Sequence, residues 1–155
     1  MAGQFHIFRW REEDLLDSGK VVLRPTVDVR VAAGDDYVSQ NCLIDTGAPI
    51  TVLPRGVGLY LGLDMPEEFS EGGETIILLG TEWPCVVRTV TMVLLPFDDL
   101  EWEAPVRFAV REGLRYGLLG SEGFLNRWVV SFNGYEGYTV VESIESFESR
   151  LPVNR

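Results

Sequence analysis

Apolar and polar residues alternate along several stretches of this chain, which is the pattern of half-buried β-strands. In VVLRPTVDVRV, Val27, Val29 and Val31 fall on one face, and Asp28 and Arg30 fall on the other. Turn sequences such as AAGDD separate the strand-like stretches. Many short strands with few helices predict a mainly β domain, organised as a closed barrel with one or two short helices.

Composition restricts the classes of partner. The chain has 155 residues, of which 46% are hydrophobic and 11% aromatic, and this predicts one folded domain over residues 1–155. Its formal charge of −11 argues against nucleic acid and anionic membranes as partners. No apolar run approaches the length of a membrane span. The opening MAGQFHIFRWREEDLL has charges where an export signal needs an apolar core, so we expect a cytoplasmic protein.

Two hairpins and two short helices are predicted beyond the first strands. A glycine-containing interruption divides a β-rich stretch into strands at about residues 74–79 and 84–95. Asn133-Gly134 is a strong signal for a further hairpin. One short helix is expected to start at Pro54, and another to be capped by Ser121.

Few residues suit metal or nucleophilic chemistry. His6 is the only histidine, which excludes a multi-histidine metal site and disfavours Ser-His-Asp and Cys-His catalysis. Cys42 and Cys85 lie in apolar strand-like sequence and are predicted to be buried free thiols. The acidic residues between Glu67 and Glu74 lack EF-hand spacing and are interpreted as a solvated face. We therefore predict no metal and no cofactor.

One carboxylate stands out in the stretch CLIDTGAPITVLP, where Asp45 lies between two apolar runs. A carboxylate is costly to remove from water unless it is paired or hydrogen-bonded. The stretch is therefore either an ordinary surface hairpin or a scaffold that carries a reactive acid. A second motif, Leu118-Leu119-Gly120 in YGLLGSEGFLNRW, has two apolar residues before a glycine, and a simple turn leaves it unexplained.

Together the two motifs resemble those of the retropepsin-like aspartic proteases, in which Asp-Thr-Gly-Ala follows two apolar residues and an apolar-apolar-Gly motif comes later. Their order and separation suit a single lobe of this family. The resemblance covers about residues 21–141, the expected core of the domain, and leaves a polar C-terminal tail at about 142–155. Asp-Thr-Gly alone would be a weak signal, and both motifs in β-rich sequence make a strong one.

The resemblance implies roles for the first motif. Asp45 is the catalytic acid, while Thr46, Gly47 and Ala48 shape the loop and contact the substrate backbone. Peptide hydrolysis without a metal needs one group that takes a proton from water and another that gives a proton to the substrate. Two neighbouring carboxylates that share one proton serve both purposes, as is known for aspartic proteases.

The chain offers one good aspartate for a mechanism that needs two. Asp17-Ser18-Gly19 is a second Asp-containing stretch, but Lys20 follows it and only 28 positions separate it from Asp45. We interpret it as a plain turn. The second carboxylate is then expected to be Asp45 of another copy, in a homodimer whose two-fold axis passes through the site.

A substrate-covering flap is also implied by the resemblance. The hairpin that begins at Glu74 is the candidate, and the pair Gly72-Gly73 is a rival position for its tip. Trp83 is interpreted either as an apolar lid or as a core aromatic residue. The candidate tip residues are Gly80, Thr81, Glu82 and Trp83.

The chain departs from the retroviral members of the family at two positions. Those proteins have an acidic residue after the Ala and an Arg after the second Gly, and the two form an ion pair. Here Pro49 and Ser121 occupy these places. Both partners are missing together, so no charge is left unpaired, but the geometry of a retroviral dimer does not carry over.

The sequence thus predicts an aspartic endopeptidase that acts on peptides or proteins and depends on homodimerisation. One alternative is a non-catalytic, monomeric module of the same fold that binds peptides or regulates a partner. Another is a domain whose proteolytic activity requires a larger partner to enforce dimerisation. Fold alone does not decide between them.

Overall fold

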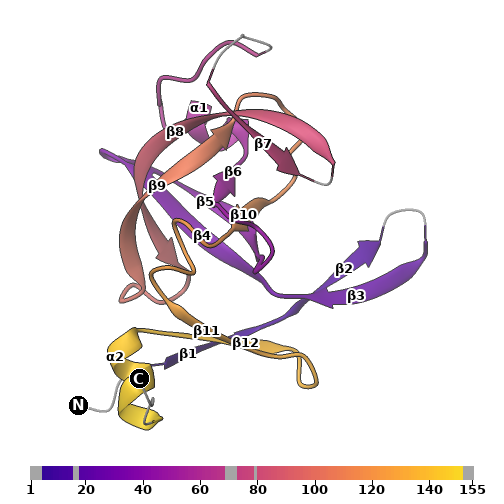
Figure 1. The fold of residues 1–155 in the computed structure, drawn as a ribbon, viewed down its shortest axis with the longest axis vertical. Helices are drawn as coiled ribbons and strands as arrows, with labels where there is room; N and C mark the ends of the chain where they lie inside the picture. Colours follow the sequence, from indigo (N-terminus) through magenta and orange to yellow (C-terminus); the bar gives the residue numbers. More distant parts are fainter. Residues whose placement is uncertain (1–4, 16–17, 69–72, 79, 152–155) are drawn as a thin grey trace. The chain divides into compact units, whose positions relative to one another are not determined.

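The computed structural model describes residues 5–15, 18–68, 73–78 and 80–151. These residues fall into two compact units, one formed by residues 27–124 and one by residues 1–26 and 125–155. We call them the central unit and the terminal unit. The fold is mainly β with two short helices, as predicted (Figure 1).

The central unit contains one sheet of seven strands in the order β4-β5-β10-β6-β9-β8-β7. β4 also pairs with β8, which is the pairing that closure into a barrel would require; the closed barrel itself stays a prediction. The strands and the helix of this unit are β4 (Thr26–Ala33), β5 (Asp36–Ile44), β6 (Val52–Leu53), α1 (Arg55–Tyr60), β7 (Glu74–Leu78), β8 (Thr81–Leu94), β9 (Glu101–Ala109) and β10 (Gly117–Leu119).

The predicted alternation on β4 is confirmed, because Val27, Val29 and Val31 are buried while Asp28 and Arg30 are half-buried. Apolar residues from neighbouring strands complete this core. The largest fully buried side chains of the central unit include Phe108, Phe124, Leu53, Met92, Leu94 and Leu119.

The predicted helix after Pro54 is present as α1, with Pro54 at its N-cap. The helix predicted after Ser121 is wrong: residues 121–128 form turns and one isolated bridge. Gly123 has a φ of +93°, which a helix cannot accommodate, and the backbone of Glu122 is bonded to the loop around Ile50.

The terminal unit holds two small sheets and one helix. Its three-stranded sheet has the order β1-β12-β11, and β2 pairs with β3 in a separate hairpin. The turn between β2 and β3 includes Ser18 and Gly19, while Asp17 lies outside the described residues. The elements are β1 (Phe5–Arg9), β2 (Arg11–Leu15), β3 (Lys20–Arg24), β11 (Val129–Asn133), β12 (Tyr138–Glu142) and α2 (Ile144–Arg150).

The stretch expected as a polar tail contains α2, a helix that was not predicted. Ser143 caps α2 by accepting a hydrogen bond from the N–H of Ser146. Glu142 is fully buried, and its carboxylate accepts hydrogen bonds from the Ser146 hydroxyl (2.8 Å) and from the Arg150 guanidinium. The ion pair at the end of the helix thus compensates the buried charge.

We expect Arg150→Met to lower the free energy of unfolding by about 1–3 kcal/mol, because it removes the cation from a buried carboxylate. Urea unfolding followed by circular dichroism measures the change. The double variant Glu142→Gln, Arg150→Met removes both charges and should be more stable than Arg150→Met alone. An equal or lower stability of the double variant would contradict this account of Glu142.

Candidate active site

Asp45 directly follows the last residue of β5, at the place where that strand meets β10. The two strands pair in parallel, with Leu119 opposite Ile44. The N–H of Asp45 donates to the carbonyl of Leu119 at 3.1 Å. Thus the two motifs found in the sequence, far apart along the chain, lie side by side in the structure.

The residues after Asp45 form a tight turn around its carboxylate. The N–H of Gly47 donates to Asp45 Oδ1 at 2.9 Å, and the N–H of Ala48 donates to the Asp45 carbonyl at 3.2 Å. A Cβ on Gly47 would lie only 3.2 Å from Oδ1. Asp45 is half-buried, Thr46 and Gly47 are exposed, and Ala48 is buried. The turn therefore supplies a backbone donor to the carboxylate and leaves the loop accessible.

Gly120 allows the second motif to approach the first. A Cβ at this position would lie 2.2 Å from the carbonyl oxygen of Ile50 and 2.7 Å from that of Ala48, closer than any side chain permits. The N–H of Gly120 donates to Thr51 Oγ1 at 3.1 Å. Because the backbones are in direct contact, only glycine fits here.

Backbone hydrogen bonds continue this contact beyond Gly120. The N–H of Ser121 donates to the carbonyl of Ala48 (2.9 Å), and the N–H of Glu122 donates to the carbonyl of Pro49 (3.0 Å). Pro49 and Ser121 are the positions at which the chain departs from the retroviral ion pair. Here main-chain bonds hold the two segments together.

The hairpin predicted as a flap is formed by β7 and β8. Leu78 is opposite Thr81 and Gly80 lies in a turn, while residue 79 is outside the described residues. Gly80, Thr81 and Glu82 are exposed at this end, while Trp83 is half-buried.

The rival position for the tip is Gly72-Gly73. Gly72 lies outside the described residues, and Gly73 precedes β7 at the root of the hairpin, where Glu74 is opposite Cys85. Closure of the hairpin over a substrate stays a prediction.

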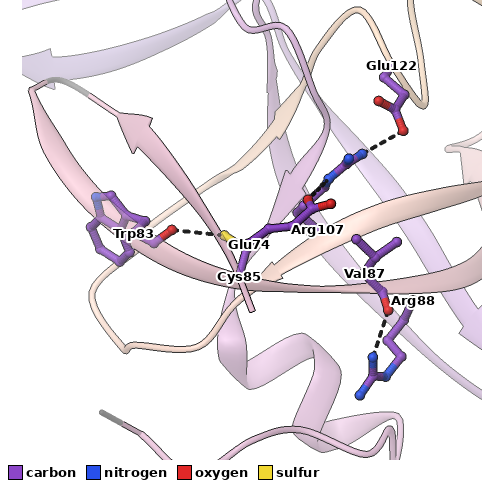
Figure 2. Close-up of polar contacts among 7 residues, drawn as sticks. All are labelled: Glu74, Trp83, Cys85, Val87, Arg88, Arg107 and Glu122. Carbon is purple, nitrogen blue, oxygen red and sulfur yellow. Dashed lines mark hydrogen bonds and ion pairs between the residues drawn. The ribbon is translucent and has the colours of Figure 1, made fainter. Parts of the chain in front are cut away.

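Sequence reasoning missed an ion-pair network beside the second motif. Arg107, on β9, donates from Nε to Glu74 Oε2 at 2.9 Å and from a terminal nitrogen to Glu122 Oε1 at 2.6 Å (Figure 2). Glu74 belongs to the acidic stretch interpreted as a solvated face; its side chain is 53% exposed and also forms this ion pair. One feature of the sequence could have indicated this network: Arg107 is the single charged residue in the apolar run APVRFAV.

The hydrogen bond that Arg107 donates to the Glu74 carboxylate, followed by the contacts with Glu122, raises the pKa of Arg107 despite the opposing effect of burial. The guanidinium therefore stays charged.

Both cysteines are buried free thiols, as predicted. Burial raises the pKa of Cys85 to about 11, with a further contribution from the Glu74 carboxylate and an opposing one from Arg107. Burial likewise raises the pKa of Cys42, whose Sγ would lie 2.4 Å from a Cβ on Gly117. The thiols are therefore neutral and packed, unlike reactive cysteines.

The described residues were compared with the requirements of a metal site and of a membrane-spanning helix. Among residues 5–15, 18–68, 73–78 and 80–151, no group of three or more His, Cys, Asp or Glu side chains could hold a metal ion. Within the same part of the chain, no helix is long and apolar enough to cross a membrane. His6 is half-buried on β1, in the terminal unit, whereas Asp45 belongs to the central unit.

Comparisons with known proteins identify the fold. No protein-family model matches the chain, and no curated protein matches it. An EIAV protease in complex with the inhibitor HBY-793 aligns over 70% of this chain and 88% of that chain, with 20% identity and a TM-score of 0.45. A retropepsin-like aspartic protease from Rickettsia conorii aligns over 88% of this chain and 98% of that chain, with 15% identity and a TM-score of 0.57. The chain thus has a retropepsin-like fold, which confirms the resemblance at the level of the fold.

We expect Gly120→Ala to destabilise the protein by at least about 2 kcal/mol, because the new methyl group would meet backbone that cannot move aside. Chemical denaturation measures the loss. Gly56→Ala, in α1, is the matched control: its Cβ meets nothing within 4 Å, and it should raise stability by up to about 1 kcal/mol. Equal effects of the two substitutions would contradict the close approach at Gly120.

Stability should fall as the pH rises from about 9 to about 11, in part because of Cys85. In this range the unfolded thiol is ionised while the folded thiol, with its pKa raised to about 11, is still neutral. Unfolding then releases a proton, which favours the unfolded state. Melting temperatures of the protein and of Cys85→Ala between pH 8 and pH 11 test this. The variant should lose less stability over that range, and a parallel decline of the two curves would contradict the expectation.

Proposed function

We propose that the chain is an aspartic endopeptidase of the retropepsin type, active as a homodimer in which Asp45 of each copy forms the catalytic pair. The observation that carries the proposal is the contact between the Asp45-Thr46-Gly47 loop and the Leu119-Gly120 segment. It is supported by the retropepsin-like fold in which that contact occurs.

Two carboxylates are required, and each chain contributes one. In the ionised form, one Asp45 accepts a proton from water as the water oxygen bonds to the peptide carbonyl carbon. The protonated Asp45 of the second copy donates its proton to the carbonyl oxygen. When the tetrahedral intermediate collapses, the C–N bond breaks, and the Asp45 that took the proton from water gives it to the leaving nitrogen. The other Asp45 takes a proton from a hydroxyl group of the intermediate, which restores the starting state of the pair. Because the pair shares one proton, activity should be highest on the acidic side of neutral pH.

The loop geometry supports this role for Asp45. The Gly47 N–H holds one carboxylate oxygen, and the exposed Thr46 is available to contact its counterpart in a second copy. Extended peptides are the expected substrates, bound by strand-like pairing with the loop and the β7–β8 hairpin. Trp83 near the tip of that hairpin would exclude water from the site when the hairpin closes.

Exposed apolar side chains support association of two copies. In the single chain, Phe5 and Ile7 on β1 are about half exposed, and so are Val21 and Leu23 on β3. Covering such side chains with a second copy would remove apolar surface from water and so stabilise a dimer. Dimerisation must overcome the repulsion of two chains of charge −11, so salt and mild acid should favour it. The buried free thiols are compatible with a cytoplasmic location.

Asp45→Asn should lower the rate of cleavage of an unstructured protein substrate by roughly 10²–10⁴-fold. Its thermal unfolding should be unchanged. Asn has nearly the same volume but cannot carry the charge. Specific activity of the unmodified protein should also fall when it is diluted below the dissociation constant of the dimer. Excess Asp45→Asn chains mixed with the unmodified protein should reduce activity further through inactive heterodimers.

Cleavage retained by Asp45→Asn would reject Asp45 as the catalytic acid. Activity that stays constant on dilution, while sedimentation detects only monomer, would reject the shared site. A protein that is monomeric, inactive and still binds peptides would instead be the non-catalytic module.

A further inference from the structure

Arg107 forms ion pairs with two carboxylates that come from different segments of the central unit. Glu74 is the first residue of β7, at the root of the hairpin, and Glu122 follows the second motif by two positions. The Arg107 side chain is only 13% exposed, whereas those of Glu74 and Glu122 are 53% and 44% exposed. Solvent therefore screens the cation less than it would screen a surface arginine.

The link between Arg107 and the hairpin crosses a whole strand. In the sheet, Ala109 is opposite Cys85, and Cys85 is opposite Glu74. Arg107 lies two residues before Ala109 and so projects to the same face of the sheet. Its guanidinium bonds to a strand that is not its neighbour, and Figure 2 shows Glu74 and Cys85 beside it.

The link to the Asp45 side of the site is equally direct. Glu122 accepts a hydrogen bond from the N–H of Thr51 (2.9 Å) and donates one to the carbonyl of Pro49 (3.0 Å). The N–H of Arg107 donates to the carbonyl of Thr51 at 3.0 Å. Arg107 thus holds Thr51 through its main chain and Glu122 through its side chain. A displacement of Glu122 would have to deform the loop that continues from Asp45.

We propose that Arg107 is a positioning residue that couples the root of the β7–β8 hairpin to the loop carrying Asp45. Movement of the hairpin at Glu74 is transmitted through the guanidinium to Glu122 and from there to residues 49–51. The catalytic part of this inference rests on the proposed function. In an active peptidase, the coupling would make the geometry of Asp45 change when the hairpin closes. The coupling itself is a property of the fold and can be measured without substrate.

A double-mutant cycle followed by amide hydrogen exchange tests the coupling. Glu74→Gln weakens the link at the hairpin, and we expect it to speed exchange of the Thr51 and Glu122 amides by roughly three- to five-fold. In an Arg107→Met background the same Glu74→Gln change should have no further effect on these amides. Arg107→Lys, which keeps the charge but loses the two-armed geometry, is a second background in case Arg107→Met fails to fold.

Arg88→Met is the matched control. Arg88 lies on β8 and donates to the carbonyls of Val87 and Asp64, away from Glu74 and Glu122. Its replacement should leave exchange at Thr51 and Glu122 unchanged. The proposal is overturned if Glu74→Gln has no effect on these amides, or if it has the same effect with and without Arg107.

Kinetics then separate this inference from the proposed function. Glu74→Gln and Arg107→Lys should raise KM for a peptide substrate and lower kcat by several-fold, whereas Arg88→Met should change neither. Unchanged kinetic constants in an active enzyme would overturn the catalytic part of the inference. If the unmodified protein has no peptidase activity, the proposed function fails, and the exchange cycle still decides whether Arg107 couples the two segments.

Discussion

The site depends on the pairing of a three-residue strand, β10, with β5 on one side and β6 on the other. β10 runs parallel to β5 and antiparallel to β6. Because parallel neighbours end at the same edge, Ile44 and Leu119 bring Asp45 and Gly120 together. The absence of a side chain on Gly120 then lets two main chains touch. The position of the acid is therefore set by backbone geometry, with little help from side chains around it.

Local sequence carried most of the information about the fold and the first motif. The alternation on β4, the helix after Pro54 and the β7–β8 hairpin depend on periodicity and on turn residues, which act over a few positions. The pairing of the two motifs was accessible only through the resemblance to a known family. Periodicity alone does not indicate which strands are neighbours.

The errors have a common physical cause, which is competition from distant contacts. Ser121 is a good helix cap, yet the backbone of Glu122 is already bonded to Pro49 and Thr51 and cannot form a helix. The ion pair between Glu74 and Arg107 was missed because it forms across β8, between residues 33 positions apart. The helix α2 was missed because its polar sequence hides a fully buried carboxylate, Glu142, that anchors it. Tertiary partners decide each of these cases, and a single sequence does not name them.

The separation of the paired strands along the chain has a consequence for biosynthesis. Cys42 and Gly117 are opposite each other in the β5–β10 pair, 75 positions apart. During translation the segment that holds the Asp45 loop is therefore made some 75 residues after β5. A chain released early, before residue 120, has the aspartate without the segment that holds it. If the protein is a peptidase, its acid is thus held in place only after β10 has been made.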